Sequence, residues 1–405
     1  FFIIIRAAVE RMETMATVKL YDDAPYEREF RARIEDLIIK ENCVGLVLDR
    51  TLFFPKEGGQ SPDKGTIGGY EVRHVYIDNE IIVHETDCPA DAFKRGDEVK
   101  GCINWDHRFS NMQNHSGEHI LSGILHSDYS SENVGFHLSD NIVTLDTSKV
   151  LSPEQIRALE KKANEVVYAD LLVDCRYYEK EELDNIDYRS KLSFEGPARL
   201  VVIPGVDICA CCAPHVKHTG QIGLIKIVKY INYKGGMRLT ILCGRRAYDY
   251  ACRQQDIIEE LMHRLSVAQD KLPEAVERLM EKVEDMKLEK VERTGRELFE
   301  KVAELDRVEG NAIIFVEEVN SITQRRAVNE LSSKHSGICG VFSGNDEDGY
   351  RFIIAVSDGD SRDTADLLKD RLGAKCGGSK EMVQGSVCAT KEGILKVLEE
   401  GYNMR

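Results

Sequence analysis

Two short clusters of histidine and cysteine, far apart in the chain, restrict its fold more than any other feature. The first is His115-Ser-Gly-Glu-His119, in which imidazoles at positions i and i+4 would lie on one face of a helix. The second runs from Cys209 to His218 and holds three thiols and two imidazoles in ten residues. Thiolate and imidazole together suit Zn²⁺, and four of them make a tetrahedral set. His115 and His119 with one cysteine and one histidine of the second cluster would supply that set, so we expect the fold to bring the clusters together.

Each cluster also has a plainer interpretation. Histidines four residues apart on a helix can be ordinary surface or core residues, and buried thiols can serve as small hydrophobic groups. The first cluster moreover matches the inverted zincin pattern H-x-x-E-H through Glu118. A metalloprotease of that kind needs an acidic third ligand downstream, whereas the second cluster offers cysteine and histidine.

Composition limits the class of protein. The chain has 54 basic and 70 acidic residues, a net charge of -16, which excludes a bulk basic polymer-binding protein but not a local basic face. No apolar run reaches 18 residues, so we expect no transmembrane helix and no membrane partner. Half of the 12 cysteines lie within one 78-residue span together with histidines, and we find no secretory signal, which favours metal binding over disulfides and predicts a cytoplasmic protein.

Hydrophobic patterning predicts an α+β fold of several domains. Residues 1–16 are expected to be an extension, because Met15 opens a natural start. Residues 17–105 carry short apolar runs separated by Gly, Pro, Asp and Asn, which predicts a small glycine-rich β-barrel domain. Residues 106–253 mix helical periodicity with strand-length runs and carry both histidine and cysteine clusters, which predicts an α/β domain with a zinc site.

The remaining chain predicts a spacer and a small domain. Residues 254–304 have apolar side chains at three-to-four spacing on a charged background, with a break at Pro273. This predicts a coiled-coil-like helical spacer, which is either a solvated arm or a surface for homodimerisation. Residues 305–405 alternate strand-length and helical patterns and predict a compact α/β domain.

Two further segments carry candidate binding residues. In the segment from Thr51 to Gly65, Gly58-Gly59 permits a close backbone approach to a ligand, and Gln60 offers both donor and acceptor, although a simple β-turn would use the same residues. From Lys217 to Arg253 there are eight basic residues and one acidic residue. That segment is either a solvated strand face or a track for nucleic-acid phosphates. Its candidate substrate-binding residues are Lys217, Arg238 and Arg245.

In this order, the motifs resemble the editing half of alanyl-tRNA synthetase and the free-standing AlaX-type editing proteins. The family pattern T-x-F-(Y/F)-x-x-x-GGQ-x-x-D-x-G matches Thr51 to Gly65, and its HxxxH motif matches His115 and His119. Its CxxxH motif, followed by V-x-x-TG-x-IG, matches Cys211 and His215. The usual CGGTH reads Cys-Cys-Ala-Pro-His here, so Cys209 and Cys212 could compete with Cys211 for the ion. The segment Gly377 to Gly385 is similar to the glycine-rich tRNA-contact segment of the family's DHHA-type C-terminal domain.

The resemblance implies a zinc-dependent trans-editing deacylase of the long AlaX form. Its expected substrate is tRNA(Ala) mischarged with serine, with the glycyl ester as a second candidate. The implied metal ligands are His115, His119 and Cys211, with His215 as a fourth or an outer member. Thr51 and Gln60 are the expected catalytic-site residues. Thr51 would contact the seryl hydroxyl, and Gly58, Gly59 and Gln60 would line the pocket near the terminal adenosine.

Two rival functions belong to other classes. One is a non-catalytic tRNA-binding protein with a structural zinc ion, and the other is the H-x-x-E-H metalloprotease. The identity of the general base is open at this stage, and the ribose 2′-hydroxyl of the substrate is one candidate.

Overall fold

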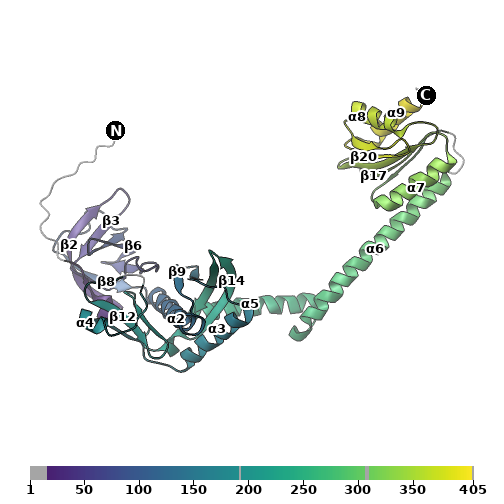
Figure 1. Ribbon diagram of the computed structural model, residues 1–405. Helices are drawn as coiled ribbons and strands as arrows, with labels where there is room; N and C mark the ends of the chain where they lie inside the picture. The colour runs from purple at the N-terminus through teal and green to yellow at the C-terminus, as the bar shows by residue number, and fades with distance from the viewer. Residues whose placement is uncertain (1–15, 191–192, 306–309, 404–405) are drawn as a thin grey trace. The chain divides into compact units, whose positions relative to one another are not determined.

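The computed structural model describes residues 16–190, 193–305 and 310–403, and the chain divides into one unit that ends at Ile258 and a second that begins at Glu259 (Figure 1). The division falls within helix α5 (Arg245–Leu265). Both units combine helices with sheets, so the predicted α+β class is confirmed. None of the helices in the described ranges is long and apolar enough to cross a lipid bilayer. The expected extension, residues 1–16, lies outside the described residues except for Ala16.

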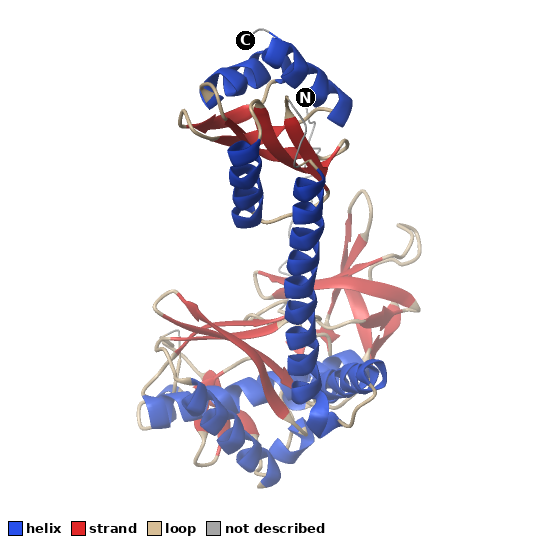
Figure 2. Cartoon of the chain, turned by 90° about the vertical axis from the view of Figure 1, so that its right-hand side faces the viewer, coloured by secondary structure: helices blue, strands red, loops and turns tan. Residues whose placement is uncertain are grey.

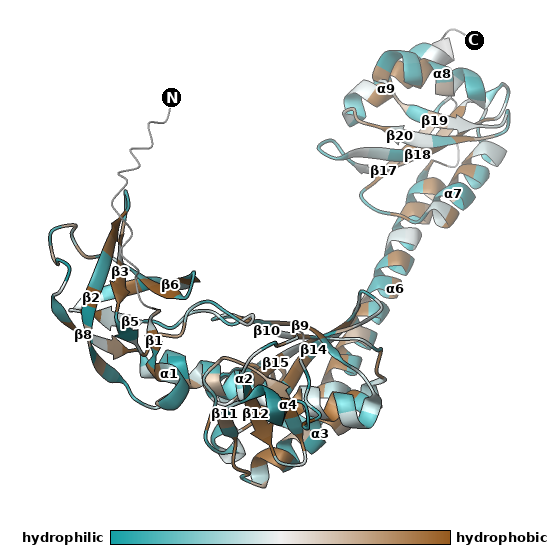
Figure 3. Ribbon diagram, turned by 60° about the vertical axis from the view of Figure 1, so that its left-hand side comes forward, coloured by the Kyte–Doolittle hydropathy of each residue, from teal (hydrophilic) through white to brown (hydrophobic). Residues whose placement is uncertain are grey.

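The N-terminal part of the first unit is a closed barrel. Its core comes from alternating strands such as β2 (Glu29–Ile39) and from β3 (Val44–Leu48), which is buried at all five positions and mainly hydrophobic in Figure 3. In barrel order the strands are β2, β3, β7 (Ile81–Thr86), β6 (Tyr70–Asp78), β5 (Gly65–Ile67) and β8 (Glu98–Ile103). The short strands β1 (Val18–Lys19) and β4 (Arg50–Thr51) pair in parallel, and α1 (Leu20–Asp23) follows β1.

Helix α2 (Trp105–Tyr129) is the central element of the rest of this unit. Every residue from Asn111 to Leu125 is buried, so the helix is packed on all sides. Two glycines make this possible, because a Cβ at Gly117 would lie 2.4 Å from Cys243 Sγ and one at Gly123 would lie 2.2 Å from the Val206 carbonyl oxygen. The surrounding strands can therefore pack closely against this helix.

Two antiparallel sheets and further helices pack around α2 in one hydrophobic core. The four-stranded sheet has the order β14 (Ile225–Tyr233), β15 (Gly236–Cys243), β10 (Val143–Thr147), β9 (Asn133–Leu138). The three-stranded sheet has the order β11 (Asp174–Tyr178), β12 (Ala198–Ile203), β13 (Asp207–Ala210). The helices are α3 (Pro153–Tyr168) and the 3₁₀ helix η1 (Thr219–Ile222), while α4 (Lys180–Leu183) packs through Leu183 in a separate small cluster with Tyr178 and Leu200.

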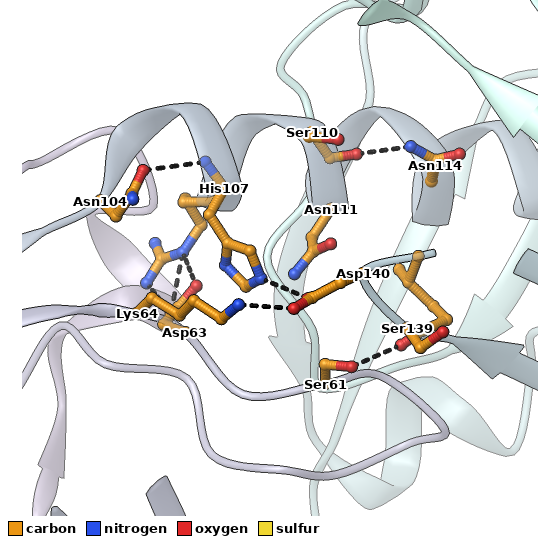
Figure 4. A network of polar contacts seen from close by, with 12 residues as sticks. Ser61, Asp63, Lys64, Asn104, His107, Ser110, Asn111, Asn114, Ser139 and Asp140 are labelled. Atoms are coloured by element: carbon orange, nitrogen blue, oxygen red, sulfur yellow. Dashed lines mark hydrogen bonds and ion pairs between the residues drawn. The ribbon is translucent and has the colours of Figure 1, made fainter. Parts of the chain in front are cut away.

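A polar network fastens the start of α2 to the segment after Gln60 (Figure 4). The Arg108 side chain is fully buried, and its Nε donates to Asp63 Oδ1 at 2.9 Å, while Nη2 contacts the same carboxylate and the Leu52 carbonyl. Asp63 also accepts the backbone N–H of Phe54 at 2.7 Å. Nearby, Lys64 Nζ lies 2.5 Å from an Asp140 carboxylate oxygen in an exposed pair. The buried pair is surrounded by protein groups that satisfy its hydrogen bonds, as a buried ion pair requires.

The second unit is a sheet between two helical layers (Figure 2). The C-terminal end of α6 (Leu272–Glu304) and α7 (Ser321–Lys334) pack on one face, and α8 (Ser361–Leu372) and α9 (Lys391–Asn403) pack on the other. Pro273 does not interrupt a helix but lies in the first turn of α6, after a break that contains Ser266 with positive φ and the 3₁₀ helix η2 (Gln269–Lys271). The sheet order is β16 (Ala312–Val316), β17 (Ile338–Asn345), β18 (Gly349–Val356), β20 (Val383–Val387), β19 (Lys375–Gly378).

The buried ion pair gives a stability prediction. Arg108→Met leaves the Asp63 carboxylate buried without its cation, so the free energy of unfolding of the first unit should fall by about 3–5 kcal/mol. Urea unfolding followed by the fluorescence of Trp105, the single tryptophan, measures it. The control Lys64→Met removes an exposed pair and should cost less than about 1 kcal/mol. Equal losses in the two variants would contradict the prediction.

Candidate metal centre

The fold brings the two histidine and cysteine clusters together. His115 and His119 come from α2, and Cys211 and His215 from the segment after β13, and one ligand atom of each lies within 4.8 Å of the others. Cys211 Sγ is 3.6 Å from His115 Nε2 and 3.4 Å from His215 Nε2. The His119 ring centroid is 4.7 Å from that of His215. These four residues, here called the ligand group, can bind a metal ion.

Each of the three imidazoles is held by its other ring nitrogen. His115 Nδ1 lies 2.7 Å from Gln60 Oε1, His119 Nδ1 lies 2.8 Å from Asp207 Oδ2, and His215 Nδ1 lies 3.0 Å from the Ser116 hydroxyl. Metal-binding histidines characteristically use such partners to fix the ring and its tautomer. The Nε2 atoms remain for coordination. One thiol and three oriented imidazoles thus fit a tetrahedral site for an ion such as Zn²⁺.

Burial sets the protonation state of the ligand group in the absence of a cation. Desolvation, with smaller contributions from neighbouring histidines and Arg199, holds the pKa of His115 and of His215 well below the ordinary value. Both imidazoles are therefore neutral, as metal ligands must be. Burial raises the pKa of the Cys211 thiol well above its usual range. A cation at the centre reverses that shift, so metal binding would release the thiol proton.

Asp207 was not found from the sequence, although it stands only two residues before Cys209. It is buried and accepts two hydrogen bonds from Arg189, at 2.7 and 2.9 Å, in addition to its contact with His119. Burial alone would raise the pKa of this carboxyl, but the hydrogen bonds to His119 and Arg189 outweigh it and the pKa is lowered. The charged Asp207 therefore orients His119, and only the packing of α2 on β13 reveals this.

Gly58 and Gly59 shape the loop that brings the Gln60 side chain into contact with His115. Gly58 and Gly59 both have positive φ, and a Cβ on Gly59 would lie 2.5 Å from the Phe136 carbonyl oxygen. The loop is laid along β9, because Leu138 N donates to Gly59 O at 2.7 Å and Ser61 N donates to Leu138 O at 2.8 Å. Gln60 is buried, and its Nε2 has no hydrogen-bond partner in the described part of the chain.

A cavity of about 930 Å³ opens beside the ligand group. Three members of the group line it, together with residues of the glycine loop and of the three-stranded sheet. The lining includes His115, His119, Cys211, Cys209, Cys212, Glu57, Gly58, Glu118, Tyr188, Arg189, Phe194 and Arg199. A ligand in this cavity would therefore reach the metal-binding side chains directly.

The chain is similar to known proteins over nearly all of its length. It is 28% identical to the alanyl-tRNA editing protein AlaX-L of Pyrococcus horikoshii, an alignment that covers 94% of this chain and 97% of that protein. It is also 30% identical to the alanine–tRNA ligase of Pyrococcus abyssi and 26% identical to that of Methanococcus maripaludis. It spans less than half of these ligases, 43% and 44% of their lengths.

Two family models match parts of the sequence. Residues 198–239 match the second additional domain of threonyl and alanyl tRNA synthetases. Residues 7–107 match the class II (A) tRNA synthetases. The resemblance to AlaX-type editing proteins is confirmed. Both ligands of the second cluster, Cys211 and His215, lie within the first of these matches.

The structure places Thr51 in the barrel and not on the cavity. Thr51 is fully buried, its hydroxyl lies 2.8 Å from His84 Nε2, and it accepts the N–H of Phe53 at 3.0 Å. Burial lowers the pKa of His84 to about 4, so this imidazole is neutral. A contact between Thr51 and the substrate stays a prediction, and it would require the hydroxyl to exchange its present partner. Gly59 and Gln60 do not line the cavity either, whereas Gly58 does.

The three basic residues predicted to bind substrate lie apart from the cavity lining. Lys217 Nζ lies 4.7 Å from the ring centroid of Tyr26. Arg238 makes two hydrogen bonds to Asp146, at 2.6 and 2.7 Å. Arg245 is exposed at the start of α5. Their role in substrate binding therefore stays a prediction.

Of the neighbouring thiols, the structure groups Cys211 with all three imidazoles. Cys209 forms a second possible set with His119 and Asp207, but Asp207 already bonds to His119 and Arg189. Glu118, the acidic residue of H-x-x-E-H, accepts hydrogen bonds from Ser122 and Asn133. No carboxylate belongs to the four-residue ligand group of the described chain, whereas a metalloprotease would need one.

The partners of the imidazoles give a prediction about metal affinity. Asp207→Asn removes the charge that orients His119, so the affinity for Zn²⁺ should fall by roughly 10- to 100-fold. Competition with a chromogenic chelator measures it. The control Asp146→Asn removes a carboxylate that is paired with Arg238 and lies outside the ligand group, and should leave the affinity unchanged. An unaltered affinity in folded Asp207→Asn protein would show that Asp207 has no such role.

Proposed function

We propose that this protein is a zinc-dependent deacylase that hydrolyses the ester bond of tRNA(Ala) mischarged with serine, with the glycyl ester as a second substrate. The observation that carries the proposal is a ligand group with three oriented imidazoles at the wall of a cavity of about 930 Å³. The name of its full-length relative, an alanyl-tRNA editing protein, supports it. Such an enzyme is needed because an alanine pocket rejects glycine or an added hydroxyl only weakly, so a second hydrolytic site corrects the errors. We place it in the cytoplasm, where tRNA is charged.

Several residues of the chain would have distinct roles in the hydrolysis. A bound zinc ion supplies Lewis acidity towards an ester carbonyl. Gln60, Asp207 and Ser116 hold the imidazoles in the orientation that coordination requires. Gly58, which lines the cavity without a side chain, leaves its backbone open to the substrate. The cavity walls remove water from around the ester, which strengthens each electrostatic contact there.

One observation favours a second candidate, a tRNA-binding protein with a structural zinc ion. The ligand group already contains four protein ligands, and four ligands close a tetrahedral site, whereas catalytic zinc keeps one position open. The deacylase proposal therefore has His115, His119 and Cys211 as firm ligands and His215 as an outer member. His215 does not line the cavity, which is compatible with that division.

The second unit is proposed to be a DHHA-type domain that contacts tRNA. The register of its strands places Arg351, Ser386 and Lys375 in one row across β18, β20 and β19, and all three are exposed. Gly377 and Gly378 are exposed next to this row. Cationic side chains beside a bare backbone suit phosphate groups, so this unit would add affinity and not chemistry.

The helical spacer is proposed to be a homodimer contact. Helix α6 exposes large apolar side chains over several turns, with Met280 68% exposed and Met286 58% exposed. They recur at three-to-four spacing, which is the pattern of a helix that packs against another helix. A second copy of the chain would cover them.

A deacylation assay tests the function. Wild-type protein should hydrolyse Ser-tRNA(Ala), measured by release of labelled serine, and spare Ala-tRNA(Ala), with about one zinc per chain by elemental analysis. His115→Ala/His119→Ala protein should lose both zinc and activity, because two ligands are gone. Equal tRNA binding by both proteins without deacylation by either would favour the structural-zinc function. Cleavage of casein instead of the ester would favour a protease.

Selectivity tests the proposed contact of Thr51. Thr51→Val keeps the shape and removes the hydroxyl, so discrimination for serine over alanine should fall by roughly 5- to 100-fold, the value of one lost hydrogen bond in a buried site. Single-turnover hydrolysis of both substrates measures this, with zinc content unchanged. The control Thr86→Val alters another fully buried barrel threonine, whose hydroxyl bonds to Val44 O. An unchanged serine-to-alanine ratio would refute the contact.

A further inference from the structure

Glu118 is a buried carboxylate that faces the cavity, where Arg189 attracts it electrostatically but donates its hydrogen bonds to Asp207. It is 4% exposed, lines the cavity and directly precedes His119 in α2. Oxygen Oε1 accepts hydrogen bonds from Asn133 Nδ2, at 2.7 Å, and from the Ser122 hydroxyl. Within the described ranges, no basic side chain forms an ion pair with it. A buried carboxylate with no cation in hydrogen-bond contact favours a cationic ligand.

The other charges of the cavity are already balanced or lie at its surface. Asp207 is paired with Arg189 through two hydrogen bonds. Arg199 pairs with Asp22 at 3.8 Å and also donates to the carbonyl oxygens of Cys211 and Ala213, both at 2.9 Å. Glu57, in the glycine loop, has an oxygen without a hydrogen-bond partner in the described chain, but this residue is only half-buried. Glu118 is therefore the strongest cation-binding group of the cavity wall.

We propose that Glu118 binds the α-ammonium group of the aminoacyl ester. This inference rests on the proposed deacylase function and names a substrate-binding residue for it. In the substrate, the ammonium nitrogen is two bonds from the carbonyl carbon. A carbonyl held at the ligand group would thus place the ammonium near the wall that carries Glu118, one residue from His119. Glu118 would select free aminoacyl esters over N-acylated ones such as peptidyl-tRNA.

The test compares two nearly isosteric substrates. Deamination of Ser-tRNA(Ala) with nitrous acid gives the glyceroyl (2,3-dihydroxypropanoyl) ester, in which a neutral hydroxyl replaces the ammonium. At pH 6.5 the α-amino group is protonated, because its pKa is near 7.7–8.0. Single-turnover hydrolysis at increasing protein concentration gives the half-saturating concentration and the maximal rate constant separately. For wild-type protein, the half-saturating concentration should be roughly 10- to 100-fold higher for the glyceroyl ester, as expected for a charged hydrogen bond.

Glu118→Gln should remove this preference and bring the ratio of the two half-saturating concentrations close to one. The amide can still accept from Ser122 and Asn133, so the fold and the zinc content should be retained. Asp128→Asn, on the same helix but exposed and paired with Lys162, is the matched charge control and should keep the preference. Glu57→Gln should keep it as well, because the inference assigns the ammonium to Glu118.

Four results would overturn the inference. Equal half-saturating concentrations for the two esters with wild-type protein would overturn the inference, and this result requires no variant. Loss of the preference in Glu57→Gln but not in Glu118→Gln would move the site to the glycine loop. An equal fall in the maximal rate constant for both esters in Glu118→Gln, with the preference retained, would make Glu118 a proton-transfer group instead. If wild-type protein hydrolysed neither ester, the deacylase function would fail, and this inference with it.

Discussion

The buried ion pair between Arg108 and Asp63 is the interaction on which the metal centre depends. It ties the first turns of α2 to the segment that follows the glycine loop, and the same carboxylate fixes the backbone at Phe54. Gln60 lies three residues before Asp63, and His115 lies seven residues after Arg108. The ion pair between Arg108 and Asp63 therefore fixes the register of the glycine loop against α2. The 2.7 Å contact between Gln60 and His115 follows from that register. A motif that reads as a glycine turn in the sequence is thus a support for a metal ligand.

The ligand group joins segments that are distant in the chain through bonds that do not need the metal. Gln60, Asp207 and Ser116 each hold one imidazole, and they come from the glycine loop, β13 and α2. The imidazoles are therefore already oriented before an ion arrives, and most of the ordering entropy is lost on folding. The Cys211 thiol must change its protonation state, since burial raises its pKa. Metal affinity should accordingly depend on pH chiefly through that thiol.

The sequence predicted those parts of the fold that follow from local patterns. The ligand spacing, the long helices and most strands of the second unit depend on near neighbours in the chain. Strand β2 was not anticipated, because its exposed face carries charged residues such as Arg31 and Arg33 between buried ones. The segment from Gly377 to Gly385, which resembles a glycine-rich tRNA-contact segment, lies in the strand pair β19 and β20 at one edge of the sheet, a pairing that we did not predict from the sequence. Strand pairing depends on a distant partner, and glycine content alone does not report it.

Ion pairs with residues of other elements also explain why a count of charges along the chain overestimates the unpaired positive charge of the segment from Lys217 to Arg253. Arg238 lies opposite Asp146 on β10, and Lys226 bonds to Glu160 on α3, so acids from other elements neutralise part of that segment. None of these partners is near in sequence. The predicted phosphate track therefore has fewer unpaired cations than the count of eight suggested. What remains exposed, such as Arg245, lies outside the cavity lining, and contacts there would steer tRNA without touching the ester.

The charges around the cavity also affect how a cationic substrate would approach the ligand group, and Glu118 is one of them. A divalent ion held by one thiolate and neutral imidazoles leaves a centre with net positive charge. A substrate that carries an ammonium group two bonds from its reacting carbon would be repelled by that centre at close range, in a cavity where the effective dielectric constant is low. Asp207 cannot offset this repulsion, because Arg189 already neutralises it. Under the proposed function, the buried carboxylate of Glu118, next to His119, would be the group that allows a cationic ester to approach a cationic centre.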